Sequence, residues 1–255
     1  MTHVILQEYY ENQPNDMFIN YAKQYSDMPF VIMLDEDENG YKAGRFLRAS
    51  DLGMSGENNE WKPVIQDKLS QQLLVPNGTM GQRWEEGKKW NLKLETEDGT
   101  PIDPMLSMVE SDYHVETIQF PYFDSSGDGI FERPIATRTI QLANGEEVKI
   151  ATVYDLMTSQ YGVQRFEHEL EATSYDDASS KYTPAWQEQI TGIKKELVTK
   201  VAKEFAQNAI DTGGRSMIIM GAGINHWFNS DTIYRSILNL VLLLSLIHIS
   251  DGARE

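Results

Sequence analysis

The stretch RSMIIMGAGINHWFNSD (residues 215–231) joins an apolar run, a glycine turn and a polar segment that is typical of a helix start. Strand, Gly-x-Gly turn and helix together suit a phosphate-bearing ligand, because glycine admits close backbone approach and the helix start offers free N–H groups. The dinucleotide fingerprint also needs a third small residue and an acidic residue about 20 positions further on. His226 occupies that third position, and the acidic residue is missing. The turn therefore predicts a ligand other than NAD.

Helical patterns precede this turn. Thr183 is a suitable N-cap with Pro184 at the first helical position, and Gly192 can end that short helix in a left-handed conformation. A second helix is predicted over residues 194–209, with one apolar stripe facing the core. The stripe comprises Leu197, Val198, Val201, Ala202 and Phe205.

A strand and a further helix complete the pattern. Gly213-Gly214 breaks the chain before a predicted strand over residues 216–220. After the turn, Ser230 or Asp231 can cap a helix. The inner face of that helix would comprise Ile233, Ile237, Leu240 and Val241. Helix, strand, turn and helix in this order indicate an α/β unit, whose ligands bind at the carboxyl end of the strand.

The first 150 residues follow other patterns. Residues 1–27 predict two helices, the second starting near Asn15-Asp16, and FVIML (30–34) predicts a buried strand. Asn39-Gly40 predicts a hairpin turn with positive φ at both residues. Similar turn signals recur at Asn77-Gly78, Asp98-Gly99 and Asn144-Gly145. We therefore expect a strand-rich and loop-rich inserted region over residues 30–150.

Composition excludes several classes of function. The 39 acidic and 22 basic side chains give a formal charge of -17, which disfavours nucleic acid as a partner. The chain has no cysteine, so it supplies no disulfide, thiolate zinc site or cysteine-ligated iron–sulfur cluster. The N-terminus lacks a secretory signal and starts in a helical pattern, so Met1 is predicted to be an internal methionine of a longer protein. The apolar run at 237–249 is shorter than the roughly 18 residues of a membrane span.

Other candidate sites are weaker. Asp124 to Gly129 resembles the start of a calcium loop, but Ile135 stands where the loop needs a bidentate glutamate. The acidic runs at 35–38 and 176–177 are better explained as solvated loops than as paired catalytic carboxylates.

The histidines divide into two groups. His3, His114 and His168 have no partner at metal-ligand spacing, so we expect ordinary surface or half-buried side chains. His226 lies in the ligand-facing turn beside Asn225, and its position leaves a structural role and a contact with cofactor or substrate equally open.

Segments in both halves of the chain carry a family resemblance. They are FLRASDL (46–52), VPNGTMGQRWEEGKKWNL (75–92), FPYF (120–123), ATVYDLMTSQYG (151–162), YTPAWQEQITGI (182–193), VAKEFAQNA (201–209) and GRSMIIMGAGINHWFNSDTIYRSILNLV (214–241). In collinear order they closely resemble the catalytic α subunits of membrane-bound respiratory nitrate reductases, members of the molybdopterin oxidoreductase (dimethyl sulfoxide reductase) family. The resemblance extends from residue 1 to about residue 242.

The resemblance implies a cofactor site at the glycine turn. Such turns in that family hold the phosphates and pterin of a molybdenum bis(molybdopterin guanine dinucleotide) cofactor. Gly221 and Gly223 would then allow close backbone approach, and a valine at Gly223 would both block the cofactor and strain a positive-φ position. Asn225 and His226 would project toward the cofactor, and His226 is the candidate catalytic residue near the metal.

The resemblance also implies a larger assembly. Family members are several times longer, and their 4Fe-4S ligands and molybdenum-ligating aspartate precede the matched region, so this chain corresponds to an internal fragment. The parent would reduce nitrate to nitrite with quinol-derived electrons, received through an iron–sulfur β subunit from a haem-containing membrane γ subunit. These partners would hold it at the cytoplasmic face of the membrane. The fragment by itself is expected to be inactive.

We divide the chain accordingly. Residues 1–29 would end a preceding domain, 30–150 form the insertion, 151–243 form a Rossmann-like α/β cofactor-binding unit, and 244–255 form a non-native tail. LSLIHI (244–249) matches the translation of CTG TCT CTT ATA CAC ATC, a sequencing-library adaptor, although a genuine continuation of the helix is the alternative. Two rival functions remain: a stand-alone acidic binding module without redox chemistry, and an oxidoreductase of the same family that acts on another substrate.

Overall fold

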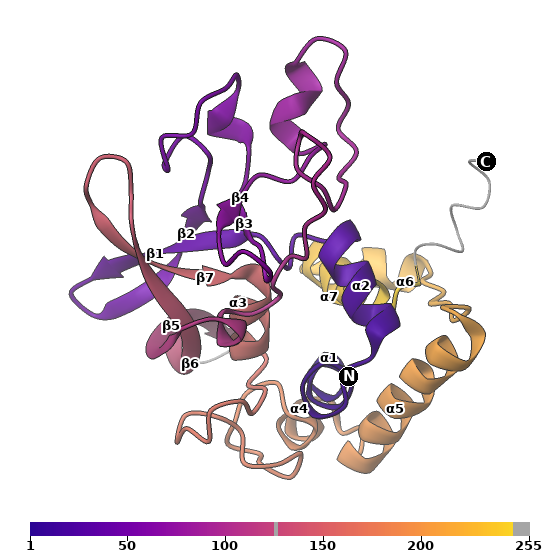
Figure 1. Ribbon diagram of the computed structural model, residues 1–255. Coiled ribbons are helices and arrows are strands. Elements are labelled where there is room, and N and C mark those ends of the chain that lie inside the picture. The colour runs from indigo at the N-terminus through magenta and orange to yellow at the C-terminus, as the bar shows by residue number, and fades with distance from the viewer. Residues whose placement is uncertain (125–126, 247–255) are drawn as a thin grey trace. The chain divides into compact units, whose positions relative to one another are not determined.

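The computed structural model describes residues 1–124 and 127–246 (Figure 1). Two compact units divide the chain: Lys23–Gln160 forms the barrel unit, and Met1–Ala22 with the chain from Tyr161 onward forms the helical unit. The mixture of helices with a strand-rich region confirms the predicted α/β class. Ser125 and Ser126 of the candidate calcium loop, and residues 247–255 of the predicted tail, lie outside the described residues.

A closed barrel forms the centre of the barrel unit (Figure 1). The strands follow one another in the order β1, β2, β5, β6 and β7, and pairing of β1 with β7 closes the barrel. Their bounds are β1 Val31–Asp37, β2 Gly40–Phe46, β5 His114–Asp124, β6 Gly127–Gln141 and β7 Glu147–Thr152. Neighbours pair antiparallel except β2 and β5, which are parallel. Closure pairs the strand edges that an open sheet would leave exposed.

The first hairpin confirms the predicted strand and corrects its turn. Residues 31–34 of β1 are buried, as the apolar run FVIML predicts. The turn consists of Glu38 and Asn39, and Gly40 is already paired with Asp37 as the first residue of β2. Gly40 has a φ of 124°, but Asn39 does not have a positive φ, so the predicted positive-φ pair was wrong.

Shorter elements surround the barrel. They are the paired strands β3 (Ile65–Gln66) and β4 (Leu73–Leu74), the 3₁₀ helices η2 (Asn59–Trp61), η3 (Met80–Trp84) and η4 (Met108–Glu110), and the helix α3 (Val153–Gln160). α3 packs against β6 and β7. Fully buried aliphatic side chains form the core of this unit, and they include Leu47, Ile65, Met105, Met108, Ile118, Ile135 and Ile150.

A buried carboxylate connects α3 to the loop before η4. Asp155 is 0% exposed and accepts hydrogen bonds from the Ser107 hydroxyl at 2.6 Å and the Met108 N–H at 2.9 Å. The Thr152 N–H lies 3.3 Å from the same carboxylate. These donors replace the water that burial removes, and without them a buried carboxylate would be very costly.

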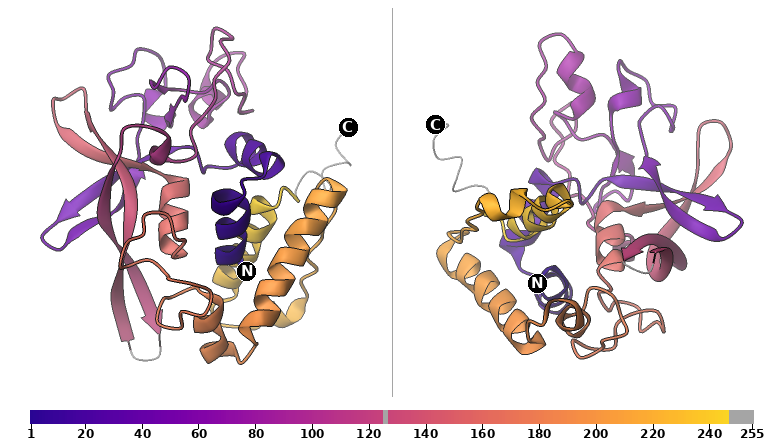
Figure 2. Two further views of the ribbon diagram at one scale, coloured as in Figure 1. Left: turned by 60° about the horizontal axis from the view of Figure 1, so that its bottom comes forward. Right: turned by 180° about the vertical axis from the view of Figure 1, so that it is seen from behind.

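Helices make up the other unit (Figure 2). They are α1 (Thr2–Leu6) with the π-helical turn η1 (Gln7–Asn12), α2 (Asp16–Tyr25), whose last residues count with the barrel unit, α4 (Pro184–Thr191), α5 (Lys195–Thr212), α6 (Ala222–Asn225) and α7 (Ser230–Leu243). α1 packs against both α5 and α7. The Tyr10 hydroxyl donates to the Leu243 carbonyl at 2.7 Å, and burial raises the pKa of this phenol well above its ordinary value. This contact fixes the end of α7.

Local helix signals are confirmed at several ends. The Asn15 side chain accepts from the N–H groups of Met17 and Phe18, so it caps α2. The Thr183 hydroxyl accepts from the Trp186 N–H at 3.1 Å, with Pro184 at the first helical position. Gly192 and Gly213 end α4 and α5 with φ values of 72° and 64°.

The predicted stripe of α5 was wrong in part, and so was the predicted cap of α7. Ala202 is fully buried as predicted, but Leu197 and Val201 are 54% and 40% exposed, and the other fully buried positions of α5 are Ala206 and Ala209. Small side chains on that stripe allow close helix packing. α7 begins at Ser230 itself with Asn229 at its N-cap, and no side chain caps it. Asp231 lies in the first turn, where its charge complements the helix dipole.

The predicted strand over residues 216–220 was also wrong for the described part of the chain. Residues 215–221 are irregular, and Met217 and Ile219 are 76% and 83% exposed. A strand of a parallel sheet needs a neighbouring strand on at least one side, and residues 1–124 and 127–246 supply none for this segment. The glycine turn therefore follows an irregular segment that pairs with no strand of the described residues.

Candidate functional site

The glycine turn is open in this structure. Gly221 precedes α6 with φ −115° and ψ −180°, and Gly223 lies within α6 without a positive φ. The expectation of a strained, left-handed Gly223 was therefore wrong. Apart from the neighbouring residues and the backbone of the helix itself, no described atom lies within 4 Å of a Cβ added at either glycine. The space above both residues is free for another group.

Asn225 and His226 lie at the end of α6. The Tyr234 hydroxyl of α7 donates to Oδ1 of Asn225, which ties the turn to the first turns of α7. His226 follows α6 with φ −88° and ψ 0°, and its side chain is exposed. The structure thus brings Gly221, Gly223, Asn225 and His226 together on one short exposed segment.

The segment offers polar groups that can bind a ligand through hydrogen bonds. α6 has 4 residues, so its dipole adds little, and any anion there would be bound directly by backbone N–H groups, an amide and an imidazole. Across the described ranges, no group of three or more His, Cys, Asp or Glu side chains could hold a metal ion. The segment can therefore contact a ligand and orient it, but it offers no set of metal ligands.

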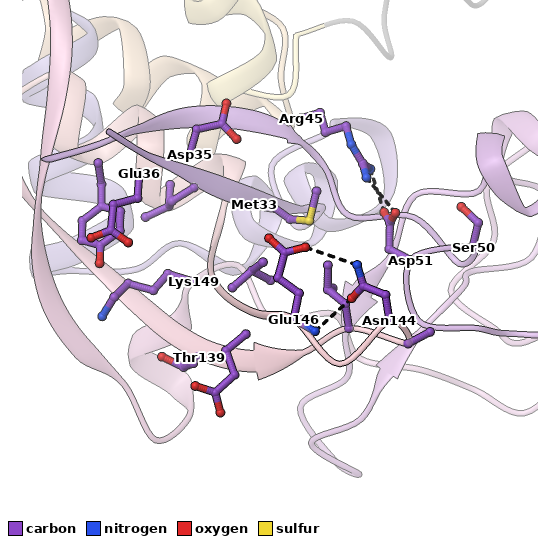
Figure 3. Close-up of a pocket in the computed structure, with 16 residues that line it drawn as sticks. Met33, Asp35, Glu36, Arg45, Ser50, Asp51, Thr139, Asn144, Glu146 and Lys149 are labelled. Atoms are coloured by element: carbon purple, nitrogen blue, oxygen red, sulfur yellow. Dashed lines mark hydrogen bonds and ion pairs between the residues drawn. The ribbon is translucent and has the colours of Figure 1, made fainter. Parts of the chain in front are cut away.

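The barrel unit contains a polar cavity of about 970 Å³ (Figure 3). It lies beside β1 and β2 and the turn between β6 and β7. Carboxylates dominate its charged lining, which comprises Asp35, Glu36, Asp51, Glu146 and Glu147 together with Arg45 and Lys149.

Several of these charges are already paired. Both terminal nitrogens of Arg45 donate to Asp51, each at 2.7 Å, and the Arg48 N–H donates to the same carboxylate at 2.9 Å. The hydrogen bonds from Arg45 hold the pKa of Asp51 below its usual range. Lys149 pairs with Glu116. Arg45 with Asp51, and Lys149 with Glu116, are therefore structural ion pairs at this cavity.

Sequence reasoning missed a group of aromatic and cationic side chains in the barrel unit. Trp61, Trp84 and Trp90 are 46%, 56% and 61% exposed. Arg48 lies over the ring of Trp61, and Arg83 lies over the ring of Trp90. The segment 75–92 has no strand or helix periodicity, and the signal that could have identified the group is its density of tryptophan, arginine and lysine.

Comparison with known proteins identifies the family. No protein-family model matches the chain. The chain is 52% identical over 253 residues to the nitrate reductase alpha chain of Bacillus subtilis, covering 99% of this chain and 20% of that protein. It is 40% identical to the respiratory nitrate reductase 1 alpha chain of Escherichia coli (99% of this chain, 21% of that protein) and 41% identical to the nitrate reductase alpha subunit of Mycobacterium tuberculosis (95% and 20%). The chain therefore belongs to the family of nitrate reductase alpha chains, and it spans about one fifth of the length of these relatives.

Proposed function

We propose that this chain is part of a molybdenum-dependent nitrate reductase α subunit, in which the turn from Gly221 to His226 contacts the cofactor. The parent protein reduces nitrate to nitrite. The observation that supports this proposal most is the similarity over 99% of the chain to nitrate reductase alpha chains, which includes the glycine turn.

The turn fits the outer part of a pterin dinucleotide. Gly221 and Gly223 leave open space for a phosphate or a pterin ring, and exposed backbone groups and the Asn225 amide can bind these groups. The chain contains no cysteine, so in this proposal the cysteine ligands of any 4Fe-4S cluster belong to other parts of the parent.

The side chains of the turn have distinct roles in this proposal. Asn225, held by the Tyr234 hydroxyl, orients the cofactor edge through its amide group. His226 presents an exposed imidazole that holds a proton at one ring nitrogen close to the bound oxyanion. Reduction of nitrate to nitrite takes up two electrons and two protons and releases water, and the bound molybdenum group supplies the electron-transfer chemistry.

The proposed partners deliver electrons and determine location. A β subunit with iron–sulfur clusters and a haem-containing membrane γ subunit pass quinol-derived electrons to the parent, which they hold at the cytoplasmic face of the membrane. Through residues 1–124 and 127–246, no helix has the length and apolar character needed to cross a membrane.

Replacement of His226 in the complete parent enzyme tests this proposal. We expect His226→Ala to retain cofactor and to lower nitrate turnover per bound molybdenum by at least about tenfold, because a proton-holding group is lost. His114→Ala is the matched control, since His114 is exposed on β5 in the other unit. Molybdenum content, melting temperature and turnover are measured on the same preparations. Unchanged turnover together with reduced thermal stability would show that His226 has a structural role and is not a site residue.

A further inference from the structure

The Asn225 side chain of the glycine turn is held by the helix that follows the turn. α6 packs against α7 (Figure 1), and the Tyr234 hydroxyl, near the start of α7, donates a hydrogen bond to Oδ1 of Asn225. Tyr234 is half-buried, whereas Asn225 is exposed. The hydrogen bond therefore joins a side chain anchored on α7 to one that a ligand can reach.

This hydrogen bond determines which end of the amide is available to a ligand. A side-chain amide carries an acceptor oxygen and a donor NH2 group on the same carbon, so an unsupported amide can turn either end toward a ligand. Since Oδ1 accepts from Tyr234, the NH2 group is the end that remains available. Within the described ranges, Nδ2 of Asn225 donates to no protein acceptor. Asn225 thus offers N–H donors to a bound group.

The two positions that border the open space lie on the side from which Asn225 projects. Gly221 immediately precedes α6 and Asn225 ends it, and residues four apart lie on one side of a helical turn. A Cβ at Gly221 would meet nothing within 4 Å beyond its chain neighbours. A ligand atom above Gly221 is therefore within the region that the Asn225 amide faces.

The charges along the segment favour a ligand with acceptor atoms. No aspartate or glutamate occurs between Asp211 and Asp231, although the chain has 39 acidic residues. Arg215 and His226 are the ionisable side chains inside this interval. Acceptor oxygens carry partial or full negative charge, which a stretch without carboxylates does not repel.

We infer that Tyr234 is a positioning residue, which holds the Asn225 amide so that its N–H groups donate to an acceptor oxygen of the cofactor. Tyr234 acts through Asn225 and transfers no proton itself. The inference rests on the proposed function, because it requires the turn to contact the cofactor. Nitrate carries oxygens of the same chemistry, and the cofactor content and the KM for nitrate distinguish these two acceptors.

Asn225→Asp in the complete parent enzyme tests the direction of the amide. The carboxylate keeps the acceptor for Tyr234 but has no N–H group, so it would place an oxygen against an oxygen of the cofactor. We expect molybdenum and releasable guanosine monophosphate per α subunit to fall at least about tenfold. Asn229→Asp adds the same charge at an exposed position beside α7 and should change both by less than about twofold.

Three results for these variants would overturn the inference. The first is wild-type cofactor content in Asn225→Asp. The second is full cofactor content with only a raised KM for nitrate, since the donor would then serve the substrate. The third is an equal loss of cofactor in Asn229→Asp, which would assign the effect to charge alone.

Tyr234→Phe tests the positioning role while it retains the ring. We expect about threefold less molybdenum per α subunit and a changed Mo(V) electron paramagnetic resonance signal. In an Asn225→Ala background the same change should alter molybdenum content by less than about twofold, because the hydroxyl acts through the amide. Tyr9→Phe is the control, since it removes a hydroxyl bond to the Lys203 carbonyl in the same unit. Equal losses from Tyr234→Phe in both backgrounds would show a purely structural role and overturn the inference.

Failure of this inference and failure of the proposed function give different results. If the turn does not contact the cofactor, Gly223→Val and Asn225→Asp both leave the molybdenum content unchanged. If Gly223→Val lowers the content and Asn225→Asp does not, the turn remains at the cofactor and the inference about the amide is wrong.

Discussion

The barrel and the glycine turn differ in how many of their strand pairings and packing contacts this chain supplies. In the barrel, β1 pairs with β7, α3 covers β6 and β7, and the buried Asp155 has hydrogen-bond donors around it. At the turn, the extended segment 215–221 has no strand partner within the described residues, and Gly221 and Gly223 border open space. The barrel thus pairs its own strand edges, whereas under the function proposed above the turn would be one wall of a site that other parts of the parent complete.

The largest expected effect concerns the chain expressed by itself. We expect it to retain no molybdenum and to show no nitrate reduction, because one wall of a cofactor cleft offers little of the contact area that binding requires. Elemental analysis and a nitrate reduction assay of the purified chain test this expectation. About one molybdenum per chain would contradict the expected difference between barrel and turn, since this chain would then supply a complete cofactor site.

Removal of the buried carboxylate should destabilise the barrel strongly. Asp155→Ala leaves the Ser107 hydroxyl and the Met108 N–H without their acceptor, which costs about 3 kcal/mol or more. Denaturant unfolding measures the loss, and hydrogen exchange identifies the strands that open. Asp112→Ala, at an exposed position in the same unit, is the control and should change stability by less than about 0.5 kcal/mol. A loss below about 1 kcal/mol for Asp155→Ala would show that the barrel does not depend on this network.

Two glycines separate steric contact from backbone strain. Gly78 and Gly87 have φ values of 78° and 75°, but a Cβ at Gly78 meets the Asn91 carbonyl whereas a Cβ at Gly87 meets nothing within 4 Å. Gly87→Ala should cost about 1 kcal/mol through its left-handed backbone. Gly78→Ala should cost about 2–4 kcal/mol, since the contact adds to the same strain. Equal losses in thermal unfolding would indicate that the loop shifts to accept the methyl group.

Acid should affect the barrel slightly through Asp51. Its pKa is held below the ordinary value by the hydrogen bonds from Arg45, so this contribution is complete above about pH 3.9 and is lost as pH falls through the lower folded pKa. Asp51→Asn should remove that pH dependence and cost less than about 1 kcal/mol at neutral pH, because Arg45 is half exposed. Unfolding curves between pH 2 and 7 measure both effects. If the Asp51→Asn variant kept the same loss of stability in acid, other carboxylates would be responsible for that loss.

Sequence patterns predicted the local features and missed the non-local ones. The cap at Asn15, the start at Thr183-Pro184 and the end at Gly213 depend on atoms within a few residues, so the sequence contains the whole cause. Closure of the barrel through β1 and β7, and the parallel pairing of β2 with β5, join distant segments that no turn signal specifies. The strand predicted at 216–220 failed for the same reason, because pairing depends on a neighbour.

The candidate site divides in the same way. The position of the glycine turn and the grouping of Asn225 with His226 follow from sequence adjacency. The sequence could not predict the hydrogen bond from Tyr234 to Asn225 or the negative φ of Gly223, which only the structure shows. The contacts of Arg48 with Trp61 and of Arg83 with Trp90 join residues of loops without periodicity, so composition could mark the segment but could not show which side chains meet.

The most direct test of the central claim is the molybdenum content of the complete parent enzyme carrying Gly223→Val. A Cβ at Gly223 would meet nothing within 4 Å beyond its chain neighbours and the backbone of its own helix, and valine is tolerated in a helix at least as well as glycine, so stability of the chain by itself should change by less than about 1 kcal/mol. In the parent, the same side chain would occupy the space that we assign to the cofactor, and molybdenum per α subunit should fall at least about tenfold. Wild-type molybdenum content in a correctly assembled Gly223→Val enzyme would contradict the assignment of this turn to the cofactor site.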